Sequence, residues 1–168
     1  MLAFLPSPIL LLINIILIPL NSVLIAIPIM ILGLIRFLLP IKPIIIMIEK
    51  ANYVLYMLWV FNNRLIISIT NNIKWHITGD EIPSTKKSCI VIYNHLGWVY
   101  ILFIAMIYHG RIPITKFFMK HSLIYIPFVG LACYALGMPF LRRYSREQLL
   151  KNPQLRKKDM ETTKKVCR

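Results

Sequence analysis

The sequence predicts an α/β domain that is preceded by two long hydrophobic membrane helices. Residues 1–35 contain no charged side chain, and a second apolar stretch runs from Ile44 to about Thr70. From about residue 73 onward, short runs rich in β-branched residues alternate with longer apolar runs. Such alternation is typical of strands joined by crossover helices. We therefore expect a membrane-embedded front at residues 1–72 and an α/β part at residues 73–168.

The composition also favours a lipid environment. Hydrophobic residues make up 58% of the chain and the mean hydropathy is +0.68, whereas soluble domains contain roughly 45–50% apolar residues. Residues 142–168 hold ten Lys/Arg and three Asp/Glu, so this segment carries +7, half of the net charge of +14. A basic segment behind an apolar front suits an anionic membrane surface, where each Lys or Arg contributes on the order of 1 kcal/mol.

The sequence also disfavours nucleic-acid binding, a disulfide framework and a metal site. The aromatic residues lie in apolar runs and do not interleave with Lys/Arg, so we expect no nucleic-acid binding. Cys89, Cys133 and Cys167 are odd in number and widely separated. We expect neither a disulfide framework nor a metal site, which fits a reducing compartment or membrane burial.

The first apolar run exceeds the roughly 20 residues that span a bilayer core. Prolines interrupt it at positions 6, 8, 19 and 28. We expect one kinked, tilted helix from about Pro8 to Arg36, and the alternative is a re-entrant hairpin that breaks near Pro19. Arg36 and Lys42, which follow the run, favour a cytoplasmic location for the rest of the chain.

The second helix is expected from Ile44 to about Thr70, after Pro40 and Pro43. It would pack back on the first helix or lie at the membrane interface. Its aromatic residues are either interfacial anchors or part of a packed core, and these are Tyr53, Tyr56 and Trp59.

The elements of the α/β part follow from local patterns. Strands are expected at Lys74–Thr78, Ser88–Tyr93, Thr115–Met119 and Met138–Leu141. Helices are expected at Trp98–Tyr108 and His121–Leu136, with a basic helical tail from Ser145. The second strand runs directly into Asn94-His95 and then Gly97, so it delivers a histidine to a strand-to-helix turn, where the imidazole can face a cleft.

Four blocks occur in a specific order along this part of the chain. They are Asn94-His95 with Gly97-Trp98, then Lys116–Lys120, then Ile126–Leu136, then Met138–Ser145. In this order the sequence resembles the 1-acyl-glycerol-3-phosphate acyltransferase family over about Trp75 to Cys167. It is most similar to the bacterial inner-membrane branch that acylates lysophospholipids. The resemblance implies a glycerolipid-acyltransferase-like sheet on the cytoplasmic side of that membrane.

The resemblance also implies a reaction in phospholipid synthesis. A fatty acyl group would pass from a thioester donor, acyl-CoA or acyl carrier protein, to a lysophospholipid hydroxyl, without a further cofactor. His95 would be the general base, and an aspartate five residues later would orient its imidazole. That position holds Tyr100. A phenol is uncharged near neutral pH and cannot offset an imidazolium charge, so we expect strongly impaired activity, on the scale of the roughly 10⁴-fold loss in serine proteases.

Two further departures from the family pattern concern charge. Gly137 stands where the branch tends to carry an acidic residue ahead of Met-Pro-Phe, and the family's phosphate-binding Glu-Gly-Thr/Ser-Arg block would lie beyond Arg168. On this basis residues 73–168 are expected to be the N-terminal half of a truncated domain. The alternatives are a non-catalytic lipid-binding relative and one half of a split enzyme whose C-terminal half is a separate chain.

The remaining site residues follow from the resemblance and from residue chemistry. Asn94 is expected mainly as a helix N-cap and secondarily near the substrate. Lys116 and Lys120 could reach the acyl donor or a lipid phosphate, although solvated lysines are an equal alternative. Arg142, Arg143 and Arg146 have the best claim to phosphate contact, with a basic membrane-facing surface as the alternative. Structural roles are expected for Gly97, Pro127 and Gly130, and only local polar roles for His76, His109 and His121.

Overall fold

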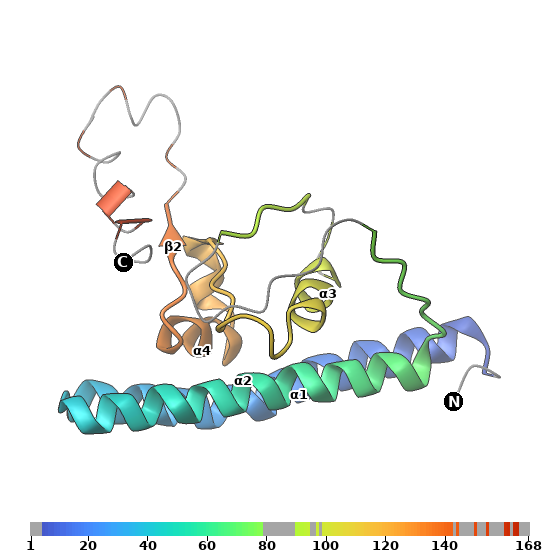
Figure 1. The fold of residues 1–168 in the computed structure, drawn as a ribbon, viewed down its shortest axis with the longest axis horizontal. Coiled ribbons are helices and arrows are strands. Elements are labelled where there is room, and N and C mark those ends of the chain that lie inside the picture. The colour runs from blue at the N-terminus through green and yellow to red at the C-terminus, as the bar shows by residue number, and fades with distance from the viewer. Residues whose placement is uncertain are drawn as a thin grey trace. The chain divides into compact units, whose positions relative to one another are not determined.

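A computed structural model describes residues 5–78, 90–94, 97, 99–142 and 144, and six further positions of the tail. Its elements are α1 (Ser7–Leu38), α2 (Lys42–Thr70), α3 (Val99–Ile107), β1 (Met119–Lys120), a 3₁₀ helix η1 (His121–Tyr125), α4 (Val129–Ala135) and β2 (Phe140–Leu141) (Figure 1). The described chain is mostly helical, with one small parallel sheet. It divides into two compact units, Met1–Ile25 with Glu49–Thr115 (unit 1) and Ala26–Ile48 with Lys116–Arg168 (unit 2).

The first helix is continuous through Pro19 and Pro28. The prediction of a single helix is therefore confirmed, and the re-entrant hairpin is wrong. α1 and α2 have 32 and 29 residues, which corresponds to about 45 Å each at 1.5 Å per residue. Both are long and apolar enough to cross a membrane.

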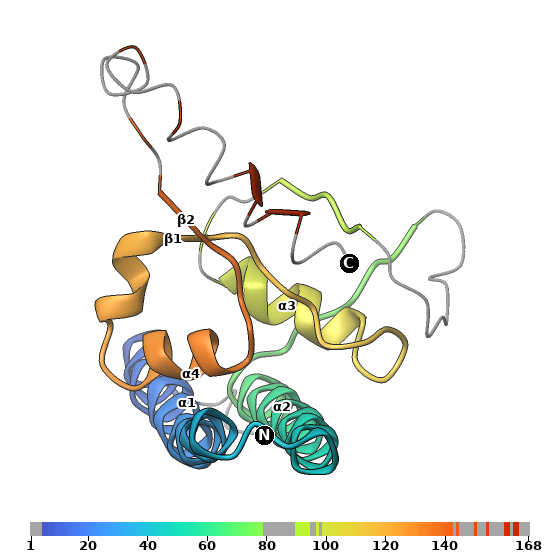
Figure 2. The same cartoon turned by 90° about the vertical axis from the view of Figure 1, so that its left-hand side faces the viewer.

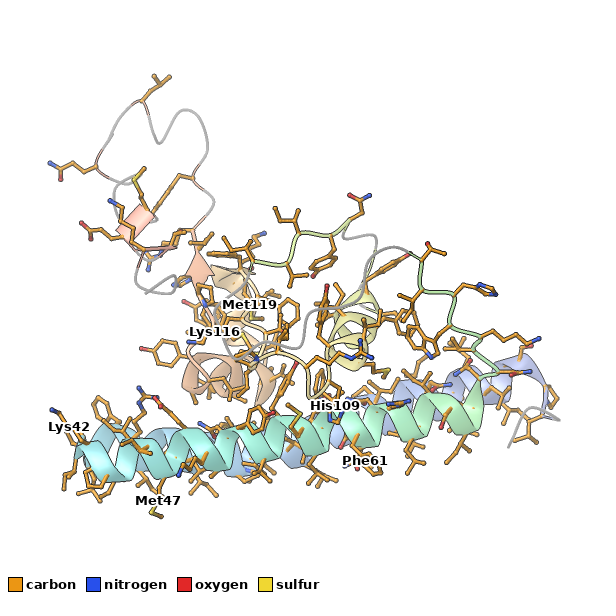
Figure 3. The ribbon with its side chains drawn as sticks, viewed as in Figure 1. Lys42, Met47, Phe61, His109, Lys116 and Met119 are labelled. Atoms are coloured by element: carbon orange, nitrogen blue, oxygen red, sulfur yellow. The ribbon has the colours of Figure 1, made fainter. Side chains whose placement is uncertain are left out.

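In unit 1, α2 carries a buried stripe at the three- and four-residue spacing of one helix face. The stripe consists of Asn52, Tyr56, Val60, Asn63, Ile67 and Thr70. Tyr56, Val60 and Ile67 form the core of this unit with Ala105 and Met106 of α3. The opposite side of α2 exposes Val54, Leu58, Phe61 and Leu65, and Phe61 points away from α3 (Figure 3). One side of α2 is thus covered by the rest of unit 1, and the other side exposes apolar side chains.

Polar side chains join α1 to α2 within unit 1, and we call them the helix seam. Asn21 donates from Nδ2 to the Trp59 carbonyl at 3.2 Å and accepts at Oδ1 from Asn62 at 3.0 Å. The Trp59 indole donates to Ser22 Oγ at 3.0 Å, and Thr70 Oγ1 donates to Asn14 Oδ1 at 2.9 Å. The second helix does pack back on the first. Tyr56 is buried in the core of this unit, as the packed-core interpretation expects, and the half-buried Trp59 takes part in the helix seam, whereas Tyr53 is 40% exposed.

In unit 2, β1 and β2 pair in parallel, with Met119 opposite Phe140 and Lys120 opposite Leu141. The backbone N–H of Met119 donates to the Pro139 carbonyl at 2.8 Å. η1 and α4 form the connection between the strands (Figure 2). A helical crossover between parallel strands is the connection that the sequence predicts, although the paired segments are shorter.

The expected helix His121–Leu136 is wrong as a single element, because it divides at residues 126–128. Ile126 is extended, with φ −68° and ψ 120°, as a residue before proline prefers, so Pro127 ends η1. α4 then starts against the preceding turn. A Cβ on Gly130 would collide with the carbonyl oxygens of Leu123 and Ile124, and a Cβ on Gly33 of α1 would lie 2.6 Å from that of Ala135. The structural role of Gly130 is therefore confirmed.

The other expected strands differ from the structure. Residues 74–78 and 90–93 are not in strands, and residues 88 and 89 lie outside the described part. The alternation at residues 74–78 serves side-chain packing instead, because Trp75 makes an edge-to-face contact with Phe103 at 5.3 Å between ring centroids. The helix expected at Trp98–Tyr108 is confirmed as α3. In the tail, the positions described from residue 150 onward are helical.

Candidate functional site

The histidine turn lies in unit 1, ahead of α3. Its central residue His95 is outside the described residues, as are Arg143 and Arg146 of the predicted site. Asn94 is exposed and lies five residues before Val99, the first residue of α3. That distance is too large for an N-cap, so this interpretation of Asn94 is wrong. The carbonyl of Gly97 accepts from the backbone N–H of Tyr100 at 3.2 Å, which gives Gly97 the predicted place in the turn.

Tyr100 lies in the first turn of α3 and is 39% exposed. Its ring meets Phe103 at 6.5 Å between centroids and an interplanar angle of 66°. Phe103 in turn contacts Trp75. The phenol side chain is therefore part of an aromatic cluster of these three rings that covers the start of α3.

Lys116 lies in unit 2, just before β1 (Figure 3). Its Nζ is 3.7 Å from the point that a Cβ of Gly137 would occupy. Gly137 has φ +73° and follows α4. The Gly137 N–H donates to the Tyr134 carbonyl at 2.9 Å, and the Met138 N–H donates to the Cys133 carbonyl at 3.0 Å. This is a left-handed helix end of the kind that favours glycine. An acidic residue at this position would have its carboxylate beside Lys116.

The carboxyl ends of β1 and β2 meet at one edge of the small sheet, because the strands are parallel. Lys120 ends β1 and is exposed, and Arg142 directly follows β2 and is exposed as well. Arg142 Nη2 lies 3.4 Å from Nε2 of His121, which is half-buried. We call Lys120, His121 and Arg142 the cationic edge. It brings together two residues that the sequence nominates and one, His121, that it does not.

His121 could have been found from the sequence. It directly follows the strand expected at Thr115–Met119, and Arg142 directly follows the strand expected at Met138–Leu141. Ligands of α/β sheets bind outside the carboxyl ends of the strands. Its ring also meets Tyr125 of η1 at 6.2 Å between centroids.

A comparison with protein families decides the class of this protein. A family model described as Acyltransferase matches residues 74–168, more than half of the chain. The chain belongs to the acyltransferase family. No curated protein and no solved structure matches it. The resemblance drawn from the four sequence blocks is confirmed as far as the acyltransferase family, and the matched region of this acyltransferase contains α3, the cationic edge and α4.

The described part of the acyltransferase region contains one cysteine and several exposed cations. Burial raises the pKa of the Cys133 thiol, so the thiol stays protonated near neutral pH and is a poor nucleophile. No three His, Cys, Asp or Glu side chains gather as metal ligands would within the described residues. Lys116, Lys120 and Arg142 are exposed cations of the kind that bind phosphate groups.

Proposed function

We propose that this acyltransferase is a membrane-bound enzyme of the lysophosphatidic acid type. It transfers a fatty acyl group from acyl-CoA or acyl carrier protein to a lysophospholipid hydroxyl. The observation that carries the proposal is the family match over residues 74–168. The cationic edge within that region supports an acceptor that bears a phosphate group.

In the proposed reaction, His95 removes the proton from the acceptor hydroxyl as the hydroxyl oxygen attacks the thioester carbonyl. A carbon–oxygen ester bond forms and the carbon–sulfur bond breaks. The histidine then returns the proton to the departing thiolate. The products are a diacyl lipid and the free thiol of the donor.

Tyr100 makes this reaction slow. An imidazolium forms transiently at His95, and a carboxylate would stabilise it, whereas a phenol cannot. Loss of such a carboxylate lowers kcat by about 10⁴-fold in the serine-protease case. A non-catalytic lipid-binding protein is the second candidate, and the same substitution at Tyr100 is the observation that favours it.

The phosphate contacts are proposed for the exposed cations of unit 2. Lys116, Lys120 and Arg142 are exposed, and the sequence between residues 116 and 142 contains no Asp or Glu. Arg143 and Arg146 extend the same basic run in the sequence. We assign to these residues the phosphate of the acceptor and the phosphates of the acyl donor, and to Asn94 a place near the acceptor hydroxyl because it precedes His95.

The membrane attachment is proposed for α1 and α2, at the bacterial inner membrane with the acyltransferase region on the cytoplasmic side. α2 packs on α3 over Tyr56, Val60 and Ile67. If α2 crossed the bilayer there, the irregular backbone at residues 90–94 and 109–113 on either side of α3 would meet lipid, where unpaired backbone groups are costly. We therefore infer that α2 lies at the interface, with the Leu58 and Phe61 side in hydrocarbon.

The test is acyl transfer by the full chain in lipid nanodiscs, with radiolabelled acyl-CoA and lysophosphatidate. We expect slow product formation that His95→Ala abolishes. Tyr100→Asp should raise turnover at least about ten-fold because the carboxylate restores the charge partner. Tyr100→Asn is the matched control, because asparagine has the shape of aspartate without its charge. It should give no gain in turnover. If neither the native chain nor Tyr100→Asp forms product while lysophosphatidate still binds, the non-catalytic function is correct.

A further inference from the structure

The turn between η1 and α4 exposes a group of large apolar side chains, which we call the aromatic surface. Its members are 38–77% exposed, and they are Tyr125, Ile126, Phe128, Leu131 and Tyr134. We propose that the aromatic surface is a further membrane contact, which lies at headgroup depth on an anionic bilayer. This contact rests on the membrane attachment proposed for α1 and α2, and the experiment below reports on the two separately.

The direction of the exposed face of α4 follows from two close contacts within unit 2. Gly130 lies against the backbone of η1, and Ala135 lies against Gly33 of α1. At roughly 100° per residue along a helix, Leu131 and Tyr134 project between the directions of Gly130 and Ala135. The exposed apolar face of α4 therefore lies between η1 and α1, next to the helix that we assign to the membrane.

Phe128, at the centre of the aromatic surface, has a backbone conformation that favours glycine. Its φ is 61° and its ψ is −59°, and the Val129 N–H donates to the Pro127 carbonyl at 2.6 Å. This is a γ-turn with positive φ, which is rare and strained for a bulky residue. The Phe128 side chain is 44% exposed, so packing within unit 2 accounts for only part of it. A contact outside the chain accounts for the rest.

The charges of unit 2 favour a lipid surface as the partner. Residues 26–48 and 116–146 of this unit contain seven Lys/Arg and no Asp or Glu. Lys120 immediately precedes η1, and Lys116 Nζ lies 3.7 Å from the Cβ position of Gly137 after α4. Anionic headgroups attract such cations, and Tyr side chains prefer the boundary between headgroups and hydrocarbon. The aromatic surface combines both features.

The place of α4 in unit 2 sets the depth of this contact. α4 lies between the two strands and the unit 2 part of α1 (Figures 1 and 2). That part of α1 exposes Ile31, Leu34 and Leu38, which suit hydrocarbon. Packed helices have axes about 8–10 Å apart, and each headgroup layer of a bilayer is roughly 5–8 Å thick. With α1 at the hydrocarbon boundary, α4 therefore lies at the level of the headgroups.

The experiment measures the depth of a fluorescent label on the aromatic surface. The full chain, with its native cysteines changed to serine, carries Leu131→Cys with an NBD label in nanodiscs of phosphatidylcholine and phosphatidylglycerol. Lipids with a nitroxide near the headgroup are the quencher. We expect them to quench this label at least about two-fold more than a lipid with the nitroxide deep in the acyl chain, as for a group at the interface. Nanodiscs of phosphatidylcholine alone should give less quenching, because they lack the anionic headgroups.

Two further label positions are the controls. Leu34→Cys lies on α1 and is 58% exposed in the native chain, so its label reports the attachment of α1. Lys120→Cys lies at the end of β1, beyond α4 from α1, and its label should be quenched least (Figure 2). Quenching at position 34 without quenching at position 131 would overturn the aromatic surface and leave the membrane attachment standing. Absence of quenching at both positions would contradict both.

A substitution at the strained turn separates membrane contact from folding. Phe128→Gly removes the ring, and glycine adopts a positive φ without strain. We expect the thermal unfolding temperature to be unchanged or higher, whereas quenching of the label at position 131 should fall about two-fold because an interfacial aromatic anchor is lost. Unchanged quenching in Phe128→Gly would overturn the proposal. So would a label that escapes quenching and instead changes its emission with the number of chains per nanodisc, since the surface would then bind a second copy.

Discussion

Polar side chains have opposite surroundings in the two units. In unit 1 the helix seam holds its asparagine and threonine side chains buried or half-buried and pairs them across two helices. In unit 2 the cationic edge presents its lysine and arginine to solvent at the end of two short strands. Buried polar pairs fix the arrangement of helices, because an unpaired group there is costly. Exposed charged side chains contribute little to stability.

The comparison predicts that unit 2 depends on close backbone packing rather than on polar pairs. In Gly130→Val the new side chain would collide with the carbonyl oxygens of Leu123 and Ile124, so we expect a loss of about 3–4 kcal/mol in stability. The alkylation rate of Cys133, which lies on α4 and is half-buried, reports the opening of this unit. Gly97→Ala is the control, because a Cβ there meets no atom within 4 Å. Equal alkylation rates in the two variants would refute this account.

The helix seam should respond to loss of its central residue. Asn21→Leu removes the hydrogen bonds to the Trp59 carbonyl and to Asn62. Interhelical hydrogen bonds in membrane proteins contribute about 0.6 kcal/mol on average and at most about 1.7 kcal/mol. We expect a loss of about 1–2 kcal/mol, measured by thermal unfolding in detergent with Trp fluorescence. Asn72→Leu, at an exposed position after α2, should unfold like the native chain.

A third substitution should raise the stability of the protein instead of lowering it. Asn63 is fully buried, and neither atom of its amide group has a hydrogen-bond partner in the described part of the chain. Asn63→Leu replaces these unpaired groups by an apolar side chain of similar size. We expect a gain of about 1 kcal/mol in the same unfolding assay. A loss of stability would mean that the Asn63 amide is paired in the membrane-bound protein.

The smallest expected effect concerns Lys116. Gly137→Asp would place a carboxylate beside Lys116 Nζ, which lies 3.7 Å from the Cβ position. We expect lysophosphatidate to bind two- to three-fold more weakly, because the ion pair reduces the charge available to the phosphate. Gly137→Asn is the matched control, since it carries the same strain at φ +73° without the charge. Equal affinity of the two variants would remove Lys116 from the binding site.

The sequence predicts the helices of this protein better than its sheet. α1, α2 and α3 follow from long apolar runs, whose burial is decided locally by helix periodicity. Strands require partners, and the alternating pattern of residues 74–78 does not reveal that Trp75 packs on Phe103 instead. Pro127 carried the signal that divides the helix expected at His121–Leu136, through its effect on Ile126.

The sequence predicts two of the three residues of the cationic edge, but not how they lie relative to one another. Lys120 and Arg142 were nominated separately, and the parallel register that brings Arg142 to His121 depends on tertiary structure. The hydrogen bonds of Asn21 could not be predicted from the sequence either. An asparagine two residues after a proline indicates a helix break as readily as a contact between helices. Its partners Trp59 and Asn62 lie on another helix.

The spacing of the helix seam has a consequence for biosynthesis. Asn14 and Asn21 are one heptad apart on α1, and their partners Thr70 and Asn62 are eight residues apart on the facing helix. A slip of one heptad would set Asn21 against Thr70, but Asn14, Ser22 and Trp59 would lose their partners. A single polar residue in a helix interface can specify register, and here several do so together. The pair of helices α1 and α2 can therefore settle into one alignment as soon as α2 is synthesised, before the acyltransferase region has emerged from the ribosome.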